Sequence, residues 1–229
     1  MTIIGKPADW PATEAEALAV QDALRGRVVL DEPGPPPGAG LVTGVDVAYD
    51  DERDLVAAAA VVLDAATLDV VERATAVGRV AFPYVPGLLA FREIPAVLAA
   101  LGHLTAGPGL VVCDGYGQAH PRRFGLASHL GVLTGLPVIG VAKNPFAFAY
   151  RPPEARRGAT SPLLADGEEV GRALCTRAGV KPVFVSAGHR VDLDHAVAHT
   201  LRLSPRYRLP ETTRHADALC RQALKEAVA

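Results

Sequence analysis

The order of extended and helical segments after residue 40 constrains the fold more than any other feature of the sequence. Apolar segments at 41–47, 55–63 and 68–77 follow one another with only short polar turns between them, which is typical of an antiparallel meander. The pattern then changes to helix and strand in alternation, with apolar strands at 109–113 and 137–142, and such alternation produces parallel strands. The order predicts an α/β protein with a mixed central β-sheet, an antiparallel meander followed by parallel strands, flanked by helices.

Helices are expected to cover this sheet. Thr13 and Glu16 match the T-x-x-E capping box, which predicts a helix running toward Arg25. Apolar stripes with helical spacing predict further helices beginning near Ile94, Phe124, Asp192 and Thr212. In the first of these, Pro95 is expected in the opening turn, where its missing N–H costs nothing, so Glu93 would stand at the helix start.

Length and composition limit the class of protein. With 229 residues, 49% of them hydrophobic and 21% charged, the chain has ordinary globular usage, and residues 1–229 are predicted to form one domain. The longest apolar run, near 56–63, is far shorter than the ~20 residues that cross a bilayer, and the N-terminus lacks a signal-peptide pattern. We therefore expect a cytoplasmic protein with no membrane partner, acting as a monomer.

The charge balance bears on nucleic-acid binding. A net charge of −2 is not that of a nonspecific nucleic-acid binder, so contacts must be local, through basic groups such as Arg122–Arg123 or 151–157. Residues 151–167, rich in Pro, Gly and Arg, are expected to form an exposed excursion. The three cysteines lie far apart without a CxxC pair, so neither a disulfide framework nor a zinc site is predicted.

Three acidic side chains stand where predicted elements begin or end. Asp46 lies between Val45 and Val47 and must point away from the face that these valines bury, although a strand-end Asp is also common on a surface. Glu93 leans toward the sheet, or is a first-turn carboxylate favoured by the helix dipole. Asp114 ends an apolar strand and precedes a glycine-rich turn, and the carboxyl ends of parallel strands are where ligands sit.

A lysine extends this set. Lys143 follows the strand 137–142 and reaches the same rim as Asp114 if the two strands are neighbours; otherwise it is an ordinary snorkelling lysine. Carboxylates beside a lysine suggest Mg²⁺ chemistry, because Mg²⁺ is bound through a few carboxylate oxygens and can activate water at a phosphodiester. The acidic stretch at 49–52 is expected to be a solvated loop.

Four segments resemble the endonuclease V family: GVDVAYD (44–50), FPYVPGLLAFREIPAVL (82–98), VVCDGYGQAHPRRFGLASHLGVLTGLPVIGVAKNPF (111–146) and RLPETTRHADAL (208–219). They span nearly the whole chain in family order, and the match is weakest at 151–167. The resemblance implies an RNase H-like fold and a DNA repair endonuclease that recognises deoxyinosine, a deaminated adenine. It implies Mg²⁺-dependent hydrolysis of the second phosphodiester bond 3′ to the lesion, leaving a 3′-OH and a 5′-phosphate, with Mn²⁺ as a substitute ion.

The resemblance also implies roles for single residues. Asp46 and Asp114 match the principal metal ligands, with Glu93 and Asp217 as further candidate ligands. The expected catalytic set is Asp46, Glu93, Asp114, Lys143 and His120.

Substrate-binding residues are implied in the same way. The segment Pro83, Tyr84, Val85 and Pro86 matches a wedge that fills the space left by an extruded base. Gly87, Leu89 and Gly115 match the pocket that receives that base, where main-chain groups read its Watson–Crick edge.

Two positions depart from the family pattern. Tyr116 stands where the DGHG form of the motif has histidine, which bears on rate or substrate preference, and Asp217 occupies a position that carries Asp in some members and His in others. Two alternatives stay open: an inosine-specific endoribonuclease of the same fold, and a noncatalytic nucleic-acid-binding domain with structural carboxylates. The joint presence of Asp46, Glu93, Asp114 and Lys143 argues against the second, because a degenerate member would have lost at least one of them, buried carboxylates without a neutralising metal being costly.

Overall fold

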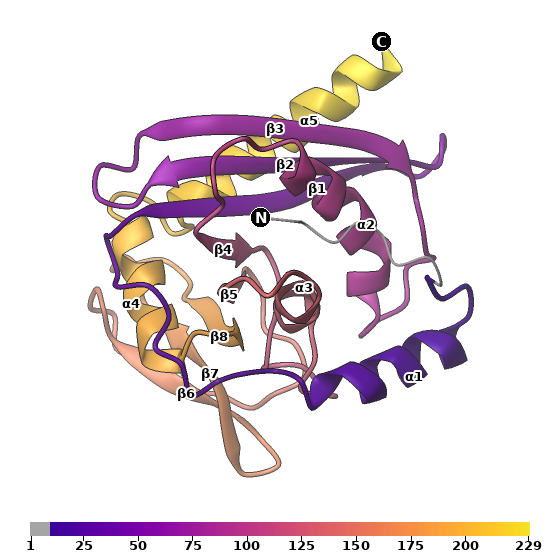
Figure 1. Ribbon diagram of the computed structural model, residues 1–229. Coiled ribbons are helices and arrows are strands. Elements are labelled where there is room, and N and C mark those ends of the chain that lie inside the picture. The colour runs from indigo at the N-terminus through magenta and orange to yellow at the C-terminus, as the bar shows by residue number, and fades with distance from the viewer. Residues whose placement is uncertain (1–9) are drawn as a thin grey trace.

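All eight strands of the structure belong to one mixed sheet (Figure 1). The structure is a computed structural model and describes residues 10–229. The strands are β1 (Leu41–Asp50), β2 (Leu55–Asp64), β3 (Val70–Arg79), β4 (Leu110–Cys113), β5 (Val138–Ala142), β6 (Thr160–Ala165), β7 (Glu168–Leu174) and β8 (Val183–His189). The helices are α1 (Glu14–Arg25), α2 (Leu89–Gly102), α3 (Leu126–Thr134), α4 (Leu193–Leu203) and α5 (Glu211–Val228).

The strand pairing confirms the predicted fold class. The sheet order is β3-β2-β1-β4-β5-β8-β7-β6. β1, β2 and β3 form the antiparallel meander, and β4 pairs in parallel with both β1 and β5. β8, β7 and β6 then continue from β5 in antiparallel pairing. β1 is thus the junction between the meander and the parallel strands, so the carboxyl ends of β1, β4 and β5 meet at one edge.

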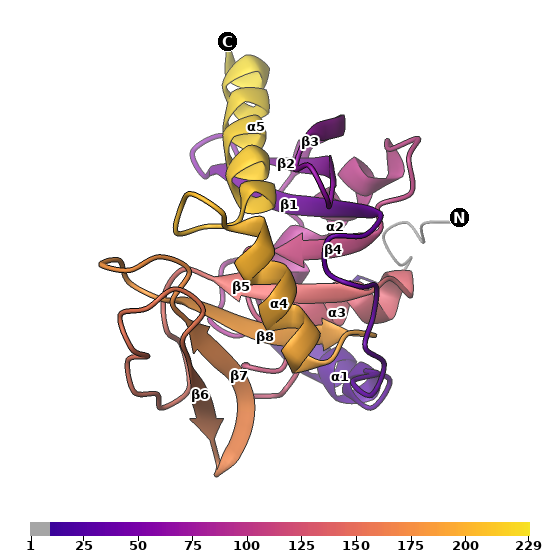
Figure 2. The same cartoon turned by 90° about the vertical axis from the view of Figure 1, so that its left-hand side faces the viewer.

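Helices cover both faces of the sheet (Figures 1 and 2). On one face Val45 of β1 packs in a cluster with Ile94 of α2 and Leu130 of α3. On the other face Val42 packs in a cluster with Ala216 of α5 and with apolar residues of α4. No helix of the described residues is long and apolar enough to cross a membrane.

A glycine allows α5 to lie unusually close to the sheet. A Cβ atom at Gly44 of β1 would lie 2.3 Å from the main-chain oxygen of Thr212, in the first turn of α5. That separation is far inside van der Waals contact, so no side chain fits between strand and helix. The close approach places α5, which carries Asp217, beside the strand that carries Asp46.

The start of α2 differs from the prediction. The helix begins at Leu89, so Glu93 lies in its second turn and Pro95 lies inside the helix. A proline there removes the hydrogen bond that would reach Phe91. The Phe91 carbonyl instead accepts a hydrogen bond from the Trp10 indole N–H at 2.9 Å. A donor 81 residues away in the sequence therefore satisfies the carbonyl that the proline leaves without a partner.

The segment predicted as an exposed excursion contains a strand. β6 and β7 form a hairpin at the edge of the sheet, and only residues before Thr160 are irregular. Pro162 lies within β6, which an edge strand tolerates because one row of its N–H groups has no ladder partner. Leu163 points inward and is fully buried, so the hairpin contributes to the core despite its polar composition.

Candidate active site

Three neighbouring strands bring the predicted polar residues together at the edge where β4 and β5 end, with Asp46 in the middle of the longer strand β1. In the pairing of β1 with β4, Val45 stands opposite Cys113, so Asp46 and Asp114 follow at the same level. β5 pairs with the other side of β4 and is followed by Lys143. The strands that precede Asp114 and Lys143 are therefore neighbours, which was the condition for the lysine to share their rim.

Asp46 is buried and incompletely hydrogen-bonded. Its Oδ1 accepts a hydrogen bond from the Val47 N–H at 2.8 Å, while Oδ2 is buried and has no hydrogen-bond partner among the described residues. Burial, and then the charge of Asp114, raise the pKa of Asp46 to about 7. A bound cation would stabilise the charged form of this carboxylate, which burial has deprived of water without providing an equivalent partner.

Glu93 reaches the same region from α2. Its side chain is 9% exposed, and its Oε1 accepts a hydrogen bond from the Tyr49 hydroxyl at 3.2 Å. Burial, followed by the charge of Asp46, raises the pKa of Glu93 to about 8. Tyr49 belongs to β1, not to a solvated loop as predicted, and the guanidinium of Arg92 lies over its ring at 4.4 Å. The strand extends to Asp50 because it keeps pairing with β2 as far as that residue.

Asp114 and Lys143 form an ion pair between Oδ2 and Nζ. Burial raises the pKa of Asp114, and the lysine opposes that shift. Burial alone would lower the pKa of Lys143, but the charge and hydrogen bond of Asp114 outweigh it and leave the pKa raised. Lys143 is therefore a fixed cation beside the carboxylates.

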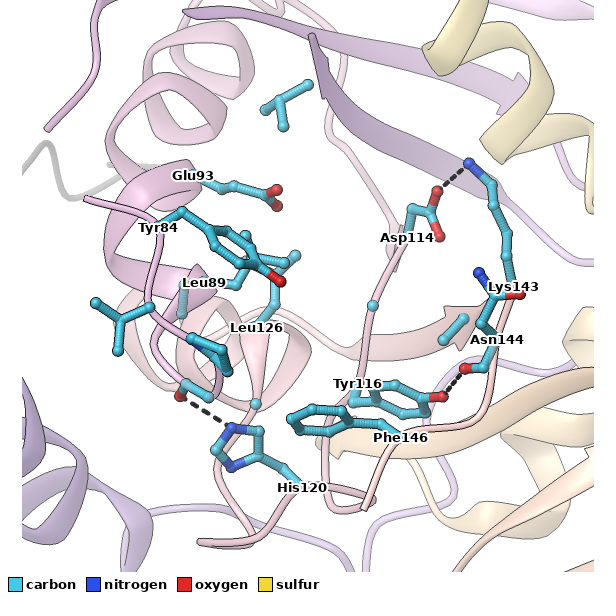
Figure 3. A pocket seen from close by; sticks show the side chains of 18 of the residues that line it. Tyr84, Leu89, Glu93, Asp114, Tyr116, His120, Leu126, Lys143, Asn144 and Phe146 are labelled. Atoms are coloured by element: carbon cyan, nitrogen blue, oxygen red, sulfur yellow. Dashed lines mark hydrogen bonds and ion pairs between the residues drawn. The ribbon is translucent and has the colours of Figure 1, made fainter. Parts of the chain in front are cut away.

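A cavity of about 430 Å³ opens beside these groups (Figure 3). Figure 3 shows Asp114 and Lys143 on one side of it, with Glu93 and Tyr84 across from them and His120 at the far end. The predicted pocket residues Gly87, Leu89 and Gly115 all line the cavity, as do Tyr84, Val85 and Pro86 of the predicted wedge. Pro83 is exposed beside them and is not among the lining residues.

The loop that carries Tyr84 is anchored on both sides of its exposed tip. Tyr84 is 68% exposed, whereas Phe82 is buried and packs against Phe91 with the ring centroids 5.7 Å apart. Gly87 has a φ of +85°, a conformation that side chains rarely adopt. Its carbonyl accepts hydrogen bonds from Gln21 of α1 and from His120, each at 3.0 Å. Tyr84 is thus exposed to solvent at the tip of a loop whose two ends are held in place.

His120 is held as a neutral imidazole. Nε2 lies 3.0 Å from the Gly87 carbonyl oxygen, and Nδ1 accepts a hydrogen bond from the Arg122 N–H at 3.2 Å. This combination requires the Nε2–H tautomer, and burial lowers the pKa of His120 to about 4. In this arrangement both nitrogens are engaged and His120 positions the Gly87 turn; its predicted catalytic role stays a prediction.

Among the lining residues that were not predicted as site residues, Tyr116, Asn144 and Phe146 form a connected group. The Tyr116 hydroxyl donates a hydrogen bond to the Asn144 carbonyl, next to Lys143. Phe146 is 45% exposed and stacks on Tyr116, with the ring centroids 6.1 Å apart. The position of Asn144 and Phe146 in the loop that follows the Lys143 strand was the available signal, since that loop must border the same rim. Tyr116 thus links the loops after β4 and β5.

Asp217 lies near the carboxylates but not in the cavity lining. Its charge raises the pKa of both Asp46 and Asp114, after larger contributions from burial and from nearer groups. Its Oδ1 accepts hydrogen bonds from Arg221 Nε at 3.1 Å and from a terminal guanidinium nitrogen of the same arginine at 2.9 Å. Asp217 is therefore placed next to the centre, with one oxygen engaged by its own helix.

The donor set fits a magnesium ion. No three His, Cys, Asp or Glu side chains of residues 10–229 form a ready-made metal cluster. Mg²⁺ does not require one, since it is commonly held by one or two carboxylates together with waters and substrate phosphate oxygens. Asp46 and Asp114 supply two such carboxylates, and the unpartnered Oδ2 of Asp46 is an oxygen that such an ion would satisfy.

Fold and site together define the class of protein: an RNase H-like α/β nuclease with a buried acidic centre at the edge of an open cavity. A family model described as Endonuclease V matches residues 22–218. The chain belongs to the endonuclease V family, as the sequence motifs predicted.

Several relatives support this assignment. Endonuclease V of Streptomyces avermitilis is 78% identical over 229 residues, with all of both chains covered, and its crystal structure superposes with a TM-score of 0.95. The catalytic domain of human endonuclease V is 33% identical, covers 97% of this chain and 99% of its own, and gives a TM-score of 0.86. Endonuclease V of Ciona intestinalis, in complex with a 24mer DNA containing an inosine followed by a ribo-adenosine, is 28% identical, covers 93% and 98%, and gives a TM-score of 0.80.

Proposed function

We propose that this protein is a Mg²⁺-dependent repair endonuclease that recognises deoxyinosine in DNA and hydrolyses the second phosphodiester bond on its 3′ side. The observation that carries the proposal is that one cavity is lined both by Asp46, Glu93 and Asp114 and by the Tyr84–Gly87 turn. A nuclease that reads a base and cuts nearby needs a base pocket and an acidic centre within one strand's reach of each other. The inosine-containing DNA bound to the Ciona intestinalis protein supports this substrate.

Lesion recognition is assigned to the anchored loop. Tyr84 is exposed at the tip of this anchored loop. Its ring stacks on the nucleobases next to the gap that an extruded inosine leaves. Gly87 and Gly115 leave space for main-chain groups to approach the flipped base, and Leu89 provides an apolar wall. His120 holds the Gly87 carbonyl in place through its Nε2–H hydrogen bond.

Hydrolysis is assigned to the strand-end groups. Asp46 and Asp114 would hold Mg²⁺, or Mn²⁺ as a substitute. When bound, the ion supplies water activation and neutralises charge on the leaving oxygen. Glu93 is oriented by the Tyr49 hydroxyl and stands as the third carboxylate. Lys143 supplies a cation for the scissile phosphate. The phosphate and Asp114 then compete for the ammonium group of Lys143.

A comparison of lesion and control duplexes tests the proposal. Wild-type protein with Mg²⁺ should cleave a duplex with one deoxyinosine and leave the matched adenine duplex intact. Asp46→Ala should abolish cleavage and retain selective binding of the lesion, because the groups assigned to read the base do not include Asp46. Full cleavage by Asp46→Ala would overturn the proposal, and selective binding without cleavage by the wild-type protein would favour a noncatalytic binding domain.

An inosine-specific endoribonuclease is the second candidate. The observation that favours it is the ribo-adenosine that follows inosine in the DNA bound to the Ciona intestinalis protein. Rates on three matched single strands would decide: all DNA, DNA with one ribonucleotide after the inosine, and all RNA. A strong preference for the RNA strand would replace the DNA substrate in our proposal, because a 2′-OH would then be recognised near the cut.

A further inference from the structure

Two loops beside the candidate active site carry positive charge with no acidic residue. Residues 176–182 and 204–210 contain Arg177, Lys181, Arg206 and Arg208 and no Asp or Glu. The chain as a whole has a net charge of −2. We call these two segments the basic loops; together they concentrate four positive charges on a protein that is otherwise slightly acidic.

The basic loops are joined to one another and to the active-site rim. The Thr176 hydroxyl donates to the Arg208 carbonyl at 2.7 Å, and Arg208 Nε donates to the Lys181 carbonyl at 2.9 Å. The Arg208 guanidinium also donates to the carbonyl of Lys143, the lysine that pairs with Asp114. Figure 2 shows the connection between α4 and α5 projecting on the side of the molecule where the loop between β7 and β8 also projects. The basic loops are therefore held against the main chain of Lys143, whose side chain pairs with Asp114.

Three cations of the basic loops, Arg177, Lys181 and Arg206, are exposed, and none of them forms an ion pair with a carboxylate among residues 10–229. The Arg177 guanidinium makes one long hydrogen bond, to the Arg206 carbonyl at 3.5 Å. Arg208 differs, because its guanidinium is engaged with the carbonyls of Lys143, Lys181 and Pro182 and holds the loops together.

Most of the basic groups that the sequence suggested are neutralised or engaged instead, although Arg151 is exposed and forms no ion pair among residues 10–229. Arg122 pairs with Asp22, and Arg123 lies 3.3 Å from Asp166 and 3.6 Å from Glu168. In the segment 151–157, Arg156 pairs with Glu154 at 3.6 Å. The Arg157 guanidinium donates to the carbonyls of Thr176, Ser204 and Leu201. Arg157 thus supports the basic loops from within and offers little free charge of its own.

We propose that the basic loops bind the phosphates of the cleaved strand on the 3′ side of the cut. The inference rests on the proposed function, which fixes the strand's direction: the lesion base enters the cavity near Gly87 and His120, and the bond to be cut lies 3′ to it beside Asp114. Figure 3 places His120 and Lys143 at opposite ends of the cavity. A strand that runs from the first to the second continues onto the basic loops, where exposed cations attract phosphates.

Salt-dependent binding measures these contacts directly. The test protein is the triple variant Arg177→Ala, Lys181→Ala and Arg206→Ala, in which no residue of the catalytic or pocket set is changed. Its affinity for a deoxyinosine duplex should fall. The negative slope of log affinity against log salt concentration should become shallower, by about one for each phosphate that the variant no longer neutralises. Removing the DNA 3′ of the cut should weaken wild-type binding and leave the triple variant nearly unchanged, whereas removing DNA 5′ of the lesion should affect both proteins equally.

A matched control carries the same change of charge at exposed arginines outside the basic loops and the segment that supports them: Arg25→Ala, Arg73→Ala and Arg79→Ala. This control should bind like the wild type with an unchanged salt slope. Circular dichroism and thermal unfolding confirm that both triple variants are folded. A wild-type salt slope in the basic-loop variant, or equal sensitivity to both DNA flanks, overturns the inference while the proposed function stands. Failure of the wild-type protein to bind or cut deoxyinosine DNA overturns both.

Discussion

Replacing Trp10 with phenylalanine should destabilise the protein through a carbonyl that a distant proline leaves without its helical donor. Pro95 lies inside α2 and cannot donate to Phe91. The Trp10 indole N–H takes that place at 2.9 Å, and its ring packs on Phe91 with the centroids 5.5 Å apart. Phenylalanine keeps an aromatic ring in this position but has no N–H, so the buried Phe91 carbonyl loses its partner.

The expected cost follows from the asymmetry of buried hydrogen bonds. Leaving a buried acceptor without a partner costs roughly 1–3 kcal/mol. For a protein of this size 1 kcal/mol shifts the melting temperature by about 2–4 °C, so a fall of several degrees is expected. The smaller ring of phenylalanine also buries less apolar area, which a single substitution cannot separate from the hydrogen bond.

A double-mutant cycle with Pro95→Ala separates these two effects. Alanine restores an N–H at position 95 that can donate to Phe91, so Trp10→Phe should cost about 1–2 kcal/mol less in the Pro95→Ala background. Urea unfolding should be followed by far-UV circular dichroism, because Trp10 is the only tryptophan and its fluorescence is absent from half of the cycle. An equal cost of Trp10→Phe in both backgrounds would refute this account of how α2 tolerates its proline.

Three other substitutions, one of them with a matched control, test the site and its support. Tyr84→Ala should weaken lesion binding by the ~1–3 kcal/mol of a stacked base and leave the Mg²⁺ titration of activity unchanged; normal lesion affinity would refute the wedge role. Gly44→Ala should destabilise the protein by about 1–3 kcal/mol or more in urea unfolding, because its Cβ would lie 2.3 Å from the Thr212 carbonyl oxygen. Gly78→Ala, with nothing within 4 Å, is its matched control and should be near neutral. Asp114→Ala should abolish cleavage in a gel assay while lesion binding persists; cleavage by this variant at the wild-type rate would contradict the role of the acidic centre.

The placement of the acidic centre could be predicted because it depends on local rules. Asp46, Asp114 and Lys143 each follow an apolar stretch of strand, and parallel neighbours end at the same edge. The family motifs added the loop at 83–87 and its glycine, which the structure places along the same cavity. The pattern of strands and helices also contained enough information for the mixed sheet, since each change of period marks a change of element.

The features that were wrong depend on partners distant in the sequence. Pro95 was placed in a first turn because nothing near it in the sequence shows that Trp10, 81 residues from Phe91, hydrogen-bonds the Phe91 carbonyl and makes an interior proline acceptable. Tyr49 was assigned to a loop because nothing local shows that β1 keeps pairing with β2 as far as Asp50.

The pairing of Arg122 and Arg123 with acidic side chains also depends on residues distant in the sequence. Arg122 and Arg123 were predicted as local nucleic-acid contacts, and the partners that neutralise them, Asp22 and Asp166, lie far away in the sequence. The edge hairpin at 160–174 was missed because its proline and charges are features of a loop. The single domain, the monomeric state and the cytoplasmic location stay predictions.

The central claim is that one cavity both reads deoxyinosine and directs a metal-dependent cut at a fixed distance from it. The most direct measurement is cleavage of an end-labelled duplex with a single deoxyinosine, with Mg²⁺ or with chelator, and mapping of the nick at single-nucleotide resolution. The account predicts a nick at the second phosphodiester bond 3′ to the lesion, with a 3′-OH and a 5′-phosphate, that disappears with chelator. A nick at another bond, or one that persists without divalent metal, would contradict it.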